Sequence, residues 1–498
     1  MNVNPITRLD YPDLDVIRVE DTYYMVSTTM HFMPGCEILQ SFDLVHWEHA
    51  TYVYETLDHT DAQQLKSGQN IYGQGMWAAS LRYHEGRFYI CFVANDTRKT
   101  YLYTSEKIDG PWKKQLIEGF YHDGSLLFDE DGRNYIVYGN DEIWITELNE
   151  DLTAPKKDGL HRLLVSDHKN PELGYEGSHI QKINGYYYIF LIHSLRDRWM
   201  RTEACFYSDS LEGEFTGGDV LCDDRGYCGQ GVAQGGIVDT PDGKWYAMLF
   251  QDSGAVGRIP ILLPVTWKDH FPFFGQNGHV PEEIEVHSTR PGYIYQPLVG
   301  SDDFCNGLLP RWQFNHDPDP RYYHLDALQG TYTITTREVC TELTQAVNTL
   351  TQRMSYPSCA AEVTVDASAL KEGDVAGLCA LQGCYAAVGI TKHHGKYEVL
   401  MLDKKEDGIL DMTEGTVVES HQMDFRLEAD FCNMKDEARC YYRVNKGDWL
   451  PIGTVHKLYF KLDHFTGCRF GLFCYAAEET GGSACFRDFK YYDVDEIS

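Results

Sequence analysis

The chain has 498 residues and a formal net charge of −32, from 75 acidic and 43 basic side chains. This charge argues against nucleic acid and anionic membrane surfaces as partners, and no run of residues approaches the roughly 18 apolar positions of a membrane span. The length predicts two or three domains. An aromatic content of 13%, with 34 tyrosines, is typical of β-rich proteins.

A four-residue motif recurs five times in the first 250 residues: a turn residue, a spacer, an aromatic or flat polar residue, and then tyrosine. The copies are Asp21–Tyr24, Gly86–Tyr89, Gly132–Tyr135, Gly185–Tyr188 and Gly243–Tyr246. A drifting period of about 50 residues is what propeller blades produce, because each blade is one antiparallel sheet with loops of variable length. Residues 1–298 are therefore predicted to form a five-bladed β-propeller.

Each repeat begins with an apolar strand and turns into an aromatic-rich one, which is a β-hairpin pattern. First strands are predicted at Val16–Val19 and Ser125–Phe128. Second strands are predicted at Met25–Ser27, Ile90–Val93, Ile136–Tyr138, Ile189–Ile192 and Ala247–Phe250.

The repeat is lost after about residue 296, and shorter strands with turns between them follow. They are predicted at Tyr332–Thr335, Ala361–Val365, Ala386–Ile390, Tyr397–Met401, Phe425–Ala429 and Arg469–Phe473. This pattern favours a β-sandwich over residues 299–498. No low-complexity linker separates the halves, so we expect a packed interface between the two domains.

One residue in each repeat lies 11 or 12 positions before the tyrosine. These residues are Asp13, Trp77, Asp123, Glu176 and Gln234. Equivalent strand positions lie at one depth around a propeller channel, so the register predicts a ring of three acids, an aromatic and an amide. Carboxylates held around one pocket are the usual means of cleaving a glycosidic bond. Alone, each acid could be a turn residue, and Trp77 could be core packing or a platform for a sugar.

His122 is expected to have a structural role, and the cysteines are not expected to bind a metal ion. His122 precedes Asp123, and alternation along a strand predicts that it faces the opposite side. The 15 cysteines are odd in number and contain no Cys-x-x-Cys pair, so a zinc site is not expected. Many unpaired thiols, with no signal peptide at the N-terminus, predict a cytoplasmic protein.

The motifs Tyr11–Val19, Asp123–Gly132 and Tyr175–Ile180 resemble those of glycoside hydrolase family 43. The second half, from Asp303-Phe304 to Phe486–Phe489, is similar to the concanavalin A-like jelly roll of the β-xylosidase branch of that family. The resemblance implies a five-bladed propeller, an all-β chain and hydrolysis in a single displacement with inversion.

The resemblance also implies roles for individual residues. Asp13 corresponds to the general base, Glu176 to the general acid, and Asp123 to the residue that tunes the acid and orients the sugar. Arg258 fits a family arginine near the substrate. His31 and Phe32 would lie on a loop at the channel mouth, where they would bind substrate.

Two positions leave alternatives open. Gln234 stands where many relatives have a histidine that helps to bind a metal, and an amide binds a cation less well. Calcium in the channel is therefore doubtful, and we expect no required cofactor and no metal ligand. Phe465, between two strand patterns of the sandwich, either reaches the pocket or belongs to the sandwich core.

The sequence thus predicts an exo-acting β-D-xylosidase that releases terminal xylose from small xylo-oligosaccharides. An α-L-arabinofuranosidase is the alternative, because the two sugars present similar atoms to one small pocket. A catalytically inactive sugar-binding propeller would need a missing acid, and all three are present. The sandwich could also mediate a homo-oligomer.

Overall fold

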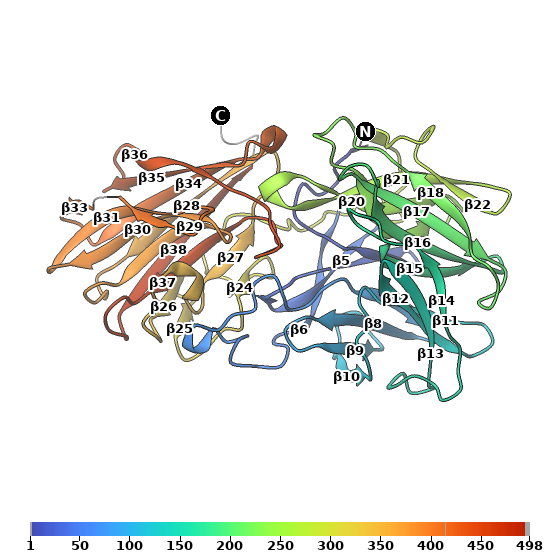
Figure 1. The fold of residues 1–498 in the computed structure, drawn as a ribbon. Coiled ribbons are helices and arrows are strands. Elements are labelled where there is room, and N and C mark those ends of the chain that lie inside the picture. Colours follow the sequence, from blue (N-terminus) through green and yellow to red (C-terminus); the bar gives the residue numbers. More distant parts are fainter. Residues whose placement is uncertain (1, 414, 494–498) are drawn as a thin grey trace.

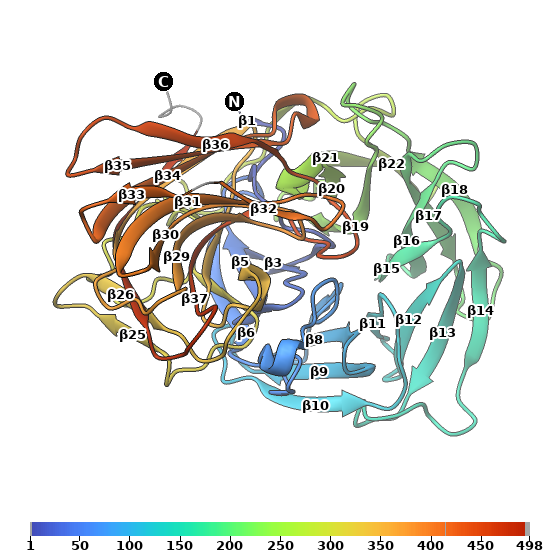
Figure 2. The same cartoon turned by 60° about the vertical axis from the view of Figure 1, so that its left-hand side comes forward.

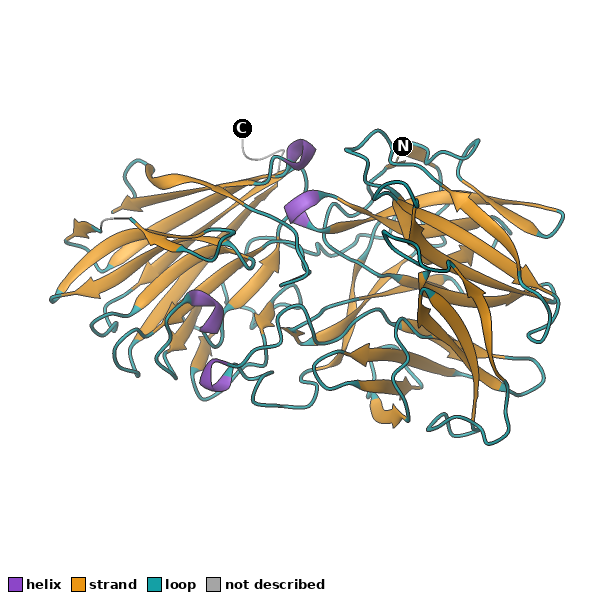
Figure 3. Cartoon of the chain, viewed as in Figure 1, coloured by secondary structure: helices purple, strands orange, loops and turns teal. Residues whose placement is uncertain are grey.

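The computed structural model describes residues 2–413 and 415–493, and the regular secondary structure of these residues is almost entirely β-strand (Figure 3). The helices within them are single 3-10 turns: η1 (Lys66–Gly68), η2 (Gly254–Val256), η3 (Leu343–Gln345) and η4 (Cys432–Met434). In this part of the chain, no helix has the length and apolarity needed to cross a membrane. The predicted all-β class, a five-bladed propeller followed by a β-sandwich, is confirmed (Figure 1).

Five four-stranded antiparallel sheets form the propeller. Blade I holds β2 (Asp15–Val19), β3 (Thr22–Ser27), β5 (Gly35–Ser41) and β6 (Glu48–Tyr54). Blade II holds β7 (Ser80–His84), β8 (Arg87–Ala94), β9 (Lys99–Ser105) and β10 (Lys113–Ile117). Blade III holds β11 (Ser125–Phe128), β12 (Asn134–Asn140), β13 (Glu142–Leu148) and β14 (His161–Ser166). Blade IV holds β15 (Glu176–Ile183), β16 (Tyr186–Ser194), β17 (Arg201–Ser208) and β18 (Thr216–Leu221). Blade V holds β19 (Val232–Asp239), β20 (Trp245–Asp252), β21 (Arg258–Lys268) and β22 (Phe271–Phe274).

The first strand of each blade lines the channel, and successive strands lie farther out (Figure 2). The innermost strands β2, β7, β11, β15 and β19 contact one another around the axis. The repeated turn joins the first strand to the second, and in four copies it uses a glycine at positive φ, where a side chain would be strained. The second strands are buried in the apolar layers between blades. The beginning and the end of the propeller domain meet where β1 (Asn2–Val3) pairs with β23 (Glu283–Ile284).

Two packed sheets form the second domain. The first sheet runs in the order β32 (Leu410–Met412), β31 (Lys396–Lys404), β30 (Tyr385–His393), β29 (Val375–Leu381), β37 (Arg469–Tyr475), β27 (Leu350–Arg353), β24 (Gln313–Asn315) and β4 (Phe32–Met33), with β33 (Thr416–Val418) beside β31. The second runs in the order β25 (Tyr323–Asp326), β26 (Thr331–Thr335), β38 (Ser483–Asp493), β28 (Ser358–Asp366), β34 (Gln422–Asp430), β35 (Glu437–Val444) and β36 (Leu450–Lys457). Alternating apolar side chains from both sheets fill one continuous core.

The strand β4 belongs to the sandwich sheet although it lies in the loop between β3 and β5 of blade I. Met33 pairs with Phe314, and Phe32 pairs with Asn315. The predicted boundary between residues 298 and 299 falls in the segment that joins β23 to β24, but it does not account for this exchanged strand. The two domains therefore share a sheet as well as a surface.

Candidate active site

The three predicted acids meet at one end of the propeller channel. Asp13 lies two residues before β2, Asp123 lies two residues before β11, and Glu176 begins β15. Asp13, Asp123, Gly177 and Gln234 line one small cavity on the axis. The repeat register therefore brought together side chains from three different blades.

The backbone at these positions departs from regular strand geometry. Asp13, Asp123 and Gln234 have φ of 51°, 48° and 59°, in the left-handed region, and Gly177 follows Glu176 with φ of 64°. The ladders of blades IV and V also shift register between Glu176 and His179 and between Ala233 and Gly236. Such bulges redirect side chains at a sheet edge, and strained backbone of this kind persists only where surrounding contacts hold it.

Asp13 is bound by a cation and a hydroxyl group. Its Oδ1 accepts a hydrogen bond from Arg258 Nη1 at 2.7 Å, and its Oδ2 accepts one from Thr28 Oγ1 at 2.8 Å. Arg258 begins β21 of blade V and is only 1% exposed, so this ion pair joins blade V to blade I. Both contacts fix the orientation of the carboxyl group, which a general base requires in order to reach the proton of a water molecule.

Asp123 occupies the least accessible position of the three acids. Its Oδ2 accepts a hydrogen bond from the Gly177 backbone N–H at 3.0 Å. Burial, with the charges of Glu176 and Asp13, raises the pKa of Asp123 to about 6, against the opposing influence of His122. Above that pH, Asp123 places a buried negative charge beside Glu176.

Glu176 is the most open of the three carboxylates, with its side chain 19% exposed. Its Oε2 accepts a hydrogen bond from Asn140 Nδ2 at 2.7 Å. Asn140 is the last residue of β12 in blade III, so the amide comes from the neighbouring blade. An accessible carboxyl group with a fixed orientation suits a group that must reach the oxygen of a leaving group.

His122 faces this site, so its predicted position on the opposite side of a strand is wrong. His122 Nε2 lies 3.6 Å from Asp123 Oδ2 and 3.6 Å from Glu176 Oε2. The prediction assumed strand alternation, but residues 122 and 123 form a turn before β11 begins at Ser125. Chiefly the charge of Asp123 raises the pKa of His122 to about 9, so a cation stands between the two carboxylates at neutral pH.

Two aromatic rings form a wall beside the acids. Trp77 packs 5.5 Å from the Phe465 ring and 6.2 Å from the His122 ring. Phe465 comes from the loop between β36 and β37 of the sandwich, and the Arg258 guanidinium lies 4.2 Å from the centre of its ring. Phe465 therefore reaches the site instead of the sandwich core, and Trp77 faces the pocket. Their sugar-binding roles stay predictions.

Gln234 packs against Gly177, the residue that follows Glu176. A Cβ atom on Gly177 would lie 2.7 Å from Gln234 Cγ, so this contact requires glycine after Glu176. The Gln234 backbone N–H donates to Glu203 Oε2 at 2.7 Å. Burial raises the pKa of Glu203 well above its usual value.

His31 and Phe32 do not lie at an open channel mouth, which corrects the prediction for both. Their exposed fractions are 0% and 1%. Phe32 lies in β4 under the guanidinium of Arg469, 3.4 Å from its ring centre, and the His31 ring packs against Tyr72 and His316. Because the strand exchange pulls this loop into the domain interface, neither side chain is accessible to a sugar.

A buried ion pair lies among the innermost strands of the channel. Asp15 Oδ2 binds Arg82 Nη1 at 2.6 Å, and Asp15 Oδ1 lies 3.0 Å from His179 Nδ1. Arg82 also donates to Ser125 and to the backbone oxygens of blades III and IV. Although burial opposes it, Arg82 and His179 lower the pKa of Asp15 to about 2. A fixed guanidinium therefore supplies a positive charge in this part of the channel.

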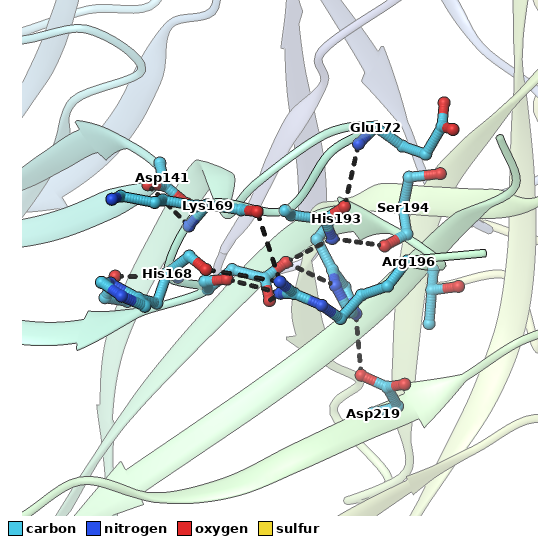
Figure 4. A network of polar contacts seen from close by, with 12 residues as sticks. Asp141, His168, Lys169, Glu172, His193, Ser194, Arg196 and Asp219 are labelled. Atoms are coloured by element: carbon cyan, nitrogen blue, oxygen red, sulfur yellow. Dashed lines mark hydrogen bonds and ion pairs between the residues drawn. The ribbon is translucent and has the colours of Figure 1, made fainter. Parts of the chain in front are cut away.

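A polar network anchors the segment that leads to Glu176 (Figure 4). His193 Nδ1 lies 3.0 Å from Asp167 Oδ2, and its Nε2 lies 2.8 Å from Asp219 Oδ1. Arg196 donates to the Asp167 backbone oxygen at 2.7 Å, and the Asp141 backbone N–H donates to the Tyr175 backbone oxygen at 2.8 Å. These contacts hold the loop between β14 and β15 against blade III on one side and blade IV on the other.

Sequence reasoning missed Thr28 and Asn140 as well as His122. A signal for the first two exists, because the second strand of each repeat ends at or beside a polar residue, at the same end of the blade as the start of the first strand. These residues are Thr28, Asn95, Asn140, Ser194 and Asp252.

Comparisons with known proteins identify the family of each domain. The sequence profile of the glycosyl hydrolases family 43 matches residues 3–272, and that of the beta xylosidase C-terminal concanavalin A-like domain matches residues 301–492. A beta-xylosidase of Formosa agariphila is 26% identical, over 99% of this chain and 89% of its own. A non-reducing end alpha-L-arabinofuranosidase of Bacteroides ovatus is 25% identical, over 66% of this chain and 63% of its own.

Among solved structures, a bifunctional GH43-CE protein of Bacteroides eggerthii superposes with a TM-score of 0.92 at 42% identity. The match covers 100% of this chain, which spans 64% of the length of that protein. With the family profile covering more than half of the sequence and three carboxylates gathered in the channel, the chain belongs to glycosyl hydrolase family 43 and is a glycoside hydrolase.

Proposed function

We propose that this glycoside hydrolase is an exo-acting, inverting β-D-xylosidase that releases terminal xylose from xylo-oligosaccharides. The observation that carries the proposal is that two acids from different blades have different hydrogen-bond partners and different exposure. Asp13 is held as an acceptor by Arg258 and Thr28, whereas Glu176 is open and oriented by Asn140. The similarity to a protein named beta-xylosidase along nearly the whole chain supports the substrate class.

The mechanism needs one water molecule and two proton transfers. Asp13 accepts a proton from water as the water oxygen attacks the anomeric carbon, and Glu176 donates its proton to the departing glycosidic oxygen. Attack and departure occur on opposite faces of the sugar, so the product has the inverted configuration. Asp123 is held beside Glu176 by the Gly177 backbone N–H, and water returns both acids to their starting states.

The second domain supports exo-action. Phe465 and Trp77 form a wall on one side of the acids, and the Phe465 loop comes from outside the propeller. A propeller channel alone is open at its mouth. A pocket that a second domain closes on one side suits the terminal sugar of an oligosaccharide. This arrangement favours removal of one terminal sugar over cleavage within a polymer.

Proton NMR of the sugar released from xylobiose tests the mechanism. We expect α-xylose to appear first from the β-linked substrate and then to equilibrate. First appearance of β-xylose would contradict the proposed roles of Asp13 and Glu176.

An α-L-arabinofuranosidase activity is the second candidate, favoured by the relative that carries this name. The ratio of kcat/KM on nitrophenyl β-D-xyloside and nitrophenyl α-L-arabinofuranoside separates the two activities. A xylosidase requires the first substrate to be preferred, and comparable values would indicate a bifunctional enzyme.

We also propose that the enzyme acts inside the cell and needs no metal ion for turnover. All fifteen cysteines are free thiols, which fits a reducing compartment. Arg82 supplies the positive charge in the channel. Efficient release of xylose from polymeric xylan by washed intact cells would contradict the first proposal. Loss of activity in chelator, reversed by calcium, would contradict the second.

A further inference from the structure

We propose that His122, Asp123 and Glu176 form a binding site for one divalent cation of the zinc type, and that the bound ion inhibits the enzyme. The site goes beyond the proposed function, because it concerns a ligand that the hydrolytic reaction does not use. It also differs from a calcium site in the channel.

The spacing of the three donor groups fits a tetrahedral ion. His122 Nε2 lies 3.6 Å from one oxygen of each carboxylate, and one ligand atom from each of the three residues lies within 4.8 Å of the others. Zinc binds nitrogen and oxygen ligands at about 2.0–2.2 Å in tetrahedral geometry, which places neighbouring ligand atoms roughly 3.3–3.6 Å apart. An ion can therefore enter with only small side-chain shifts.

The donor atoms are oriented toward one another, and binding of the ion would release the proton that His122 carries. His122 Nε2 is buried, yet it has no hydrogen-bond partner among the described residues. Glu176 is held from outside by Asn140, and Asp123 is held by the Gly177 backbone N–H. Metal-binding carboxylates are commonly oriented by such outer hydrogen bonds.

The composition of the site selects the class of ion. One imidazole and two carboxylates supply three nitrogen and oxygen ligands, and a zinc ion held by three protein ligands leaves a fourth position to water. Calcium takes six to eight oxygen ligands in proteins, and this cluster offers fewer. Zinc and its neighbours in the transition series should therefore bind well, and calcium and magnesium poorly.

Inhibition follows from which residues the ion would occupy. Glu176 bound to a cation cannot carry the proton that the leaving group needs. Substrate and ion should compete, because both require Glu176.

Isothermal titration of the full-length protein with zinc chloride, in a buffer that does not bind metals, tests the site. We expect one ion per chain. His122→Gln should weaken binding at least tenfold, since even outer partners of metal ligands contribute roughly 10–100-fold. His324→Gln, at an exposed histidine of β25, is the matched control and should bind like the wild type.

Cobalt binding gives a second test on the wild-type protein, in case His122→Gln fails to fold. Four-coordinate cobalt should show strong visible absorption, which added zinc abolishes. No saturable zinc binding, unchanged affinity in His122→Gln, or the weak spectrum of six-coordinate cobalt would each overturn the site. Both measurements are independent of turnover, so a protein that binds zinc but cleaves no xyloside would contradict only the proposed function.

Discussion

At the scale of single residues, three carboxylates of similar chemistry are given different states by their neighbours. Asp13 is paired with the Arg258 cation, Asp123 is buried with a raised pKa, and Glu176 is partly exposed beside the Asn140 amide. Pairs of acids whose environments differ in this way identify which group accepts and which group donates a proton.

The leaving group should reveal the role of Glu176. We expect Glu176→Gln to slow xylobiose hydrolysis by roughly 10²–10⁴-fold, because general acid catalysis contributes about that much. Aryl xylosides with acidic phenols leave without a proton and should be affected far less. Steady-state rates on a series of phenols measure this, and equal losses across the series would exclude Glu176 as the acid.

The raised pKa of His122 predicts how stability depends on pH. The unfolded chain loses this proton near the ordinary pKa of 6.5, and the folded chain loses it near 9. The stabilisation is therefore complete below pH 6.5 and is lost as the pH rises through 9. Its size is on the order of 3 kcal/mol, since one pKa unit corresponds to about 1.4 kcal/mol.

Denaturant unfolding of the wild type and His122→Gln at several pH values measures this contribution. The difference in unfolding free energy between them should be largest at pH 6 and should shrink by pH 10. A difference that does not change with pH would show that His122 carries no extra proton in the folded state.

The sequence revealed the acids but not all of their partners, for a physical reason. The acids occupy equivalent places in a repeat, so register alone brings them together. His122 was misplaced because left-handed backbone at Asp123 breaks strand alternation, and no pattern in one sequence marks that conformation. His31 and Phe32 were misplaced because their burial depends on contacts with residues almost 300 positions away.

At the scale of elements, the loop between β36 and β37 connects the sandwich to the site. The Gly467 backbone N–H donates to Asp10 Oδ2 at 2.8 Å, and the Cys468 N–H donates to the Ala255 oxygen at 2.8 Å. Asp10 also accepts a hydrogen bond from the Arg258 backbone N–H at 2.7 Å. The same aspartate therefore positions both the Phe465 loop and the arginine that holds Asp13.

Two substitutions in this loop should have separable effects. Phe465→Ala removes one wall of the pocket and should chiefly raise KM, by roughly fivefold for about 1 kcal/mol of lost ring contact. Gly467→Ala places a Cβ atom 2.2 Å from the Val256 oxygen, so the loop must move. Small displacements can lower turnover by roughly 10²-fold.

Steady-state kinetics on xylobiose distinguish these effects. Gly218→Ala, in a strand of blade IV with no atom near the added Cβ, is the matched control. Wild-type kinetics in Gly467→Ala would show that the loop does not position the site.

Element patterns in the sequence predicted the blade hairpins well, because turn and strand signals lie within a few residues of each other. The strand β4 carried no such signal. It has two residues, and its partner β24 is supplied by the other domain.

At the scale of the whole molecule, charged side chains of the two domains are buried together. Arg353 of β27 binds Glu37 of β5 at 2.8 Å, and both side chains are less than 5% exposed. Arg353 also donates to the Asp10 backbone oxygen and lies over the Tyr11 ring. Separation of the domains would leave a buried carboxylate without its cation.

Deletion of residues 300–498 should therefore abolish activity. The fragment loses Phe465, the partner strand of β4, and the cation of Glu37; loss of one partner of a buried pair alone costs roughly 3–5 kcal/mol. Scanning calorimetry should show one cooperative transition for the intact chain and a lower or absent transition for the fragment. A folded, fully active propeller fragment would show that the sandwich is only an appendage.

The exchanged strand has a consequence for building chimeric enzymes. A sandwich grafted from a relative at the segment between β23 and β24 would arrive without the edge strand that Phe32 and Met33 supply. The unpaired edge of the grafted sheet would then face the loop between β3 and β5, whose side chains pack against a different sheet in this protein. A successful graft must exchange two separate stretches of chain, the second domain and the loop between β3 and β5, so these domains are modular in sequence but not in assembly.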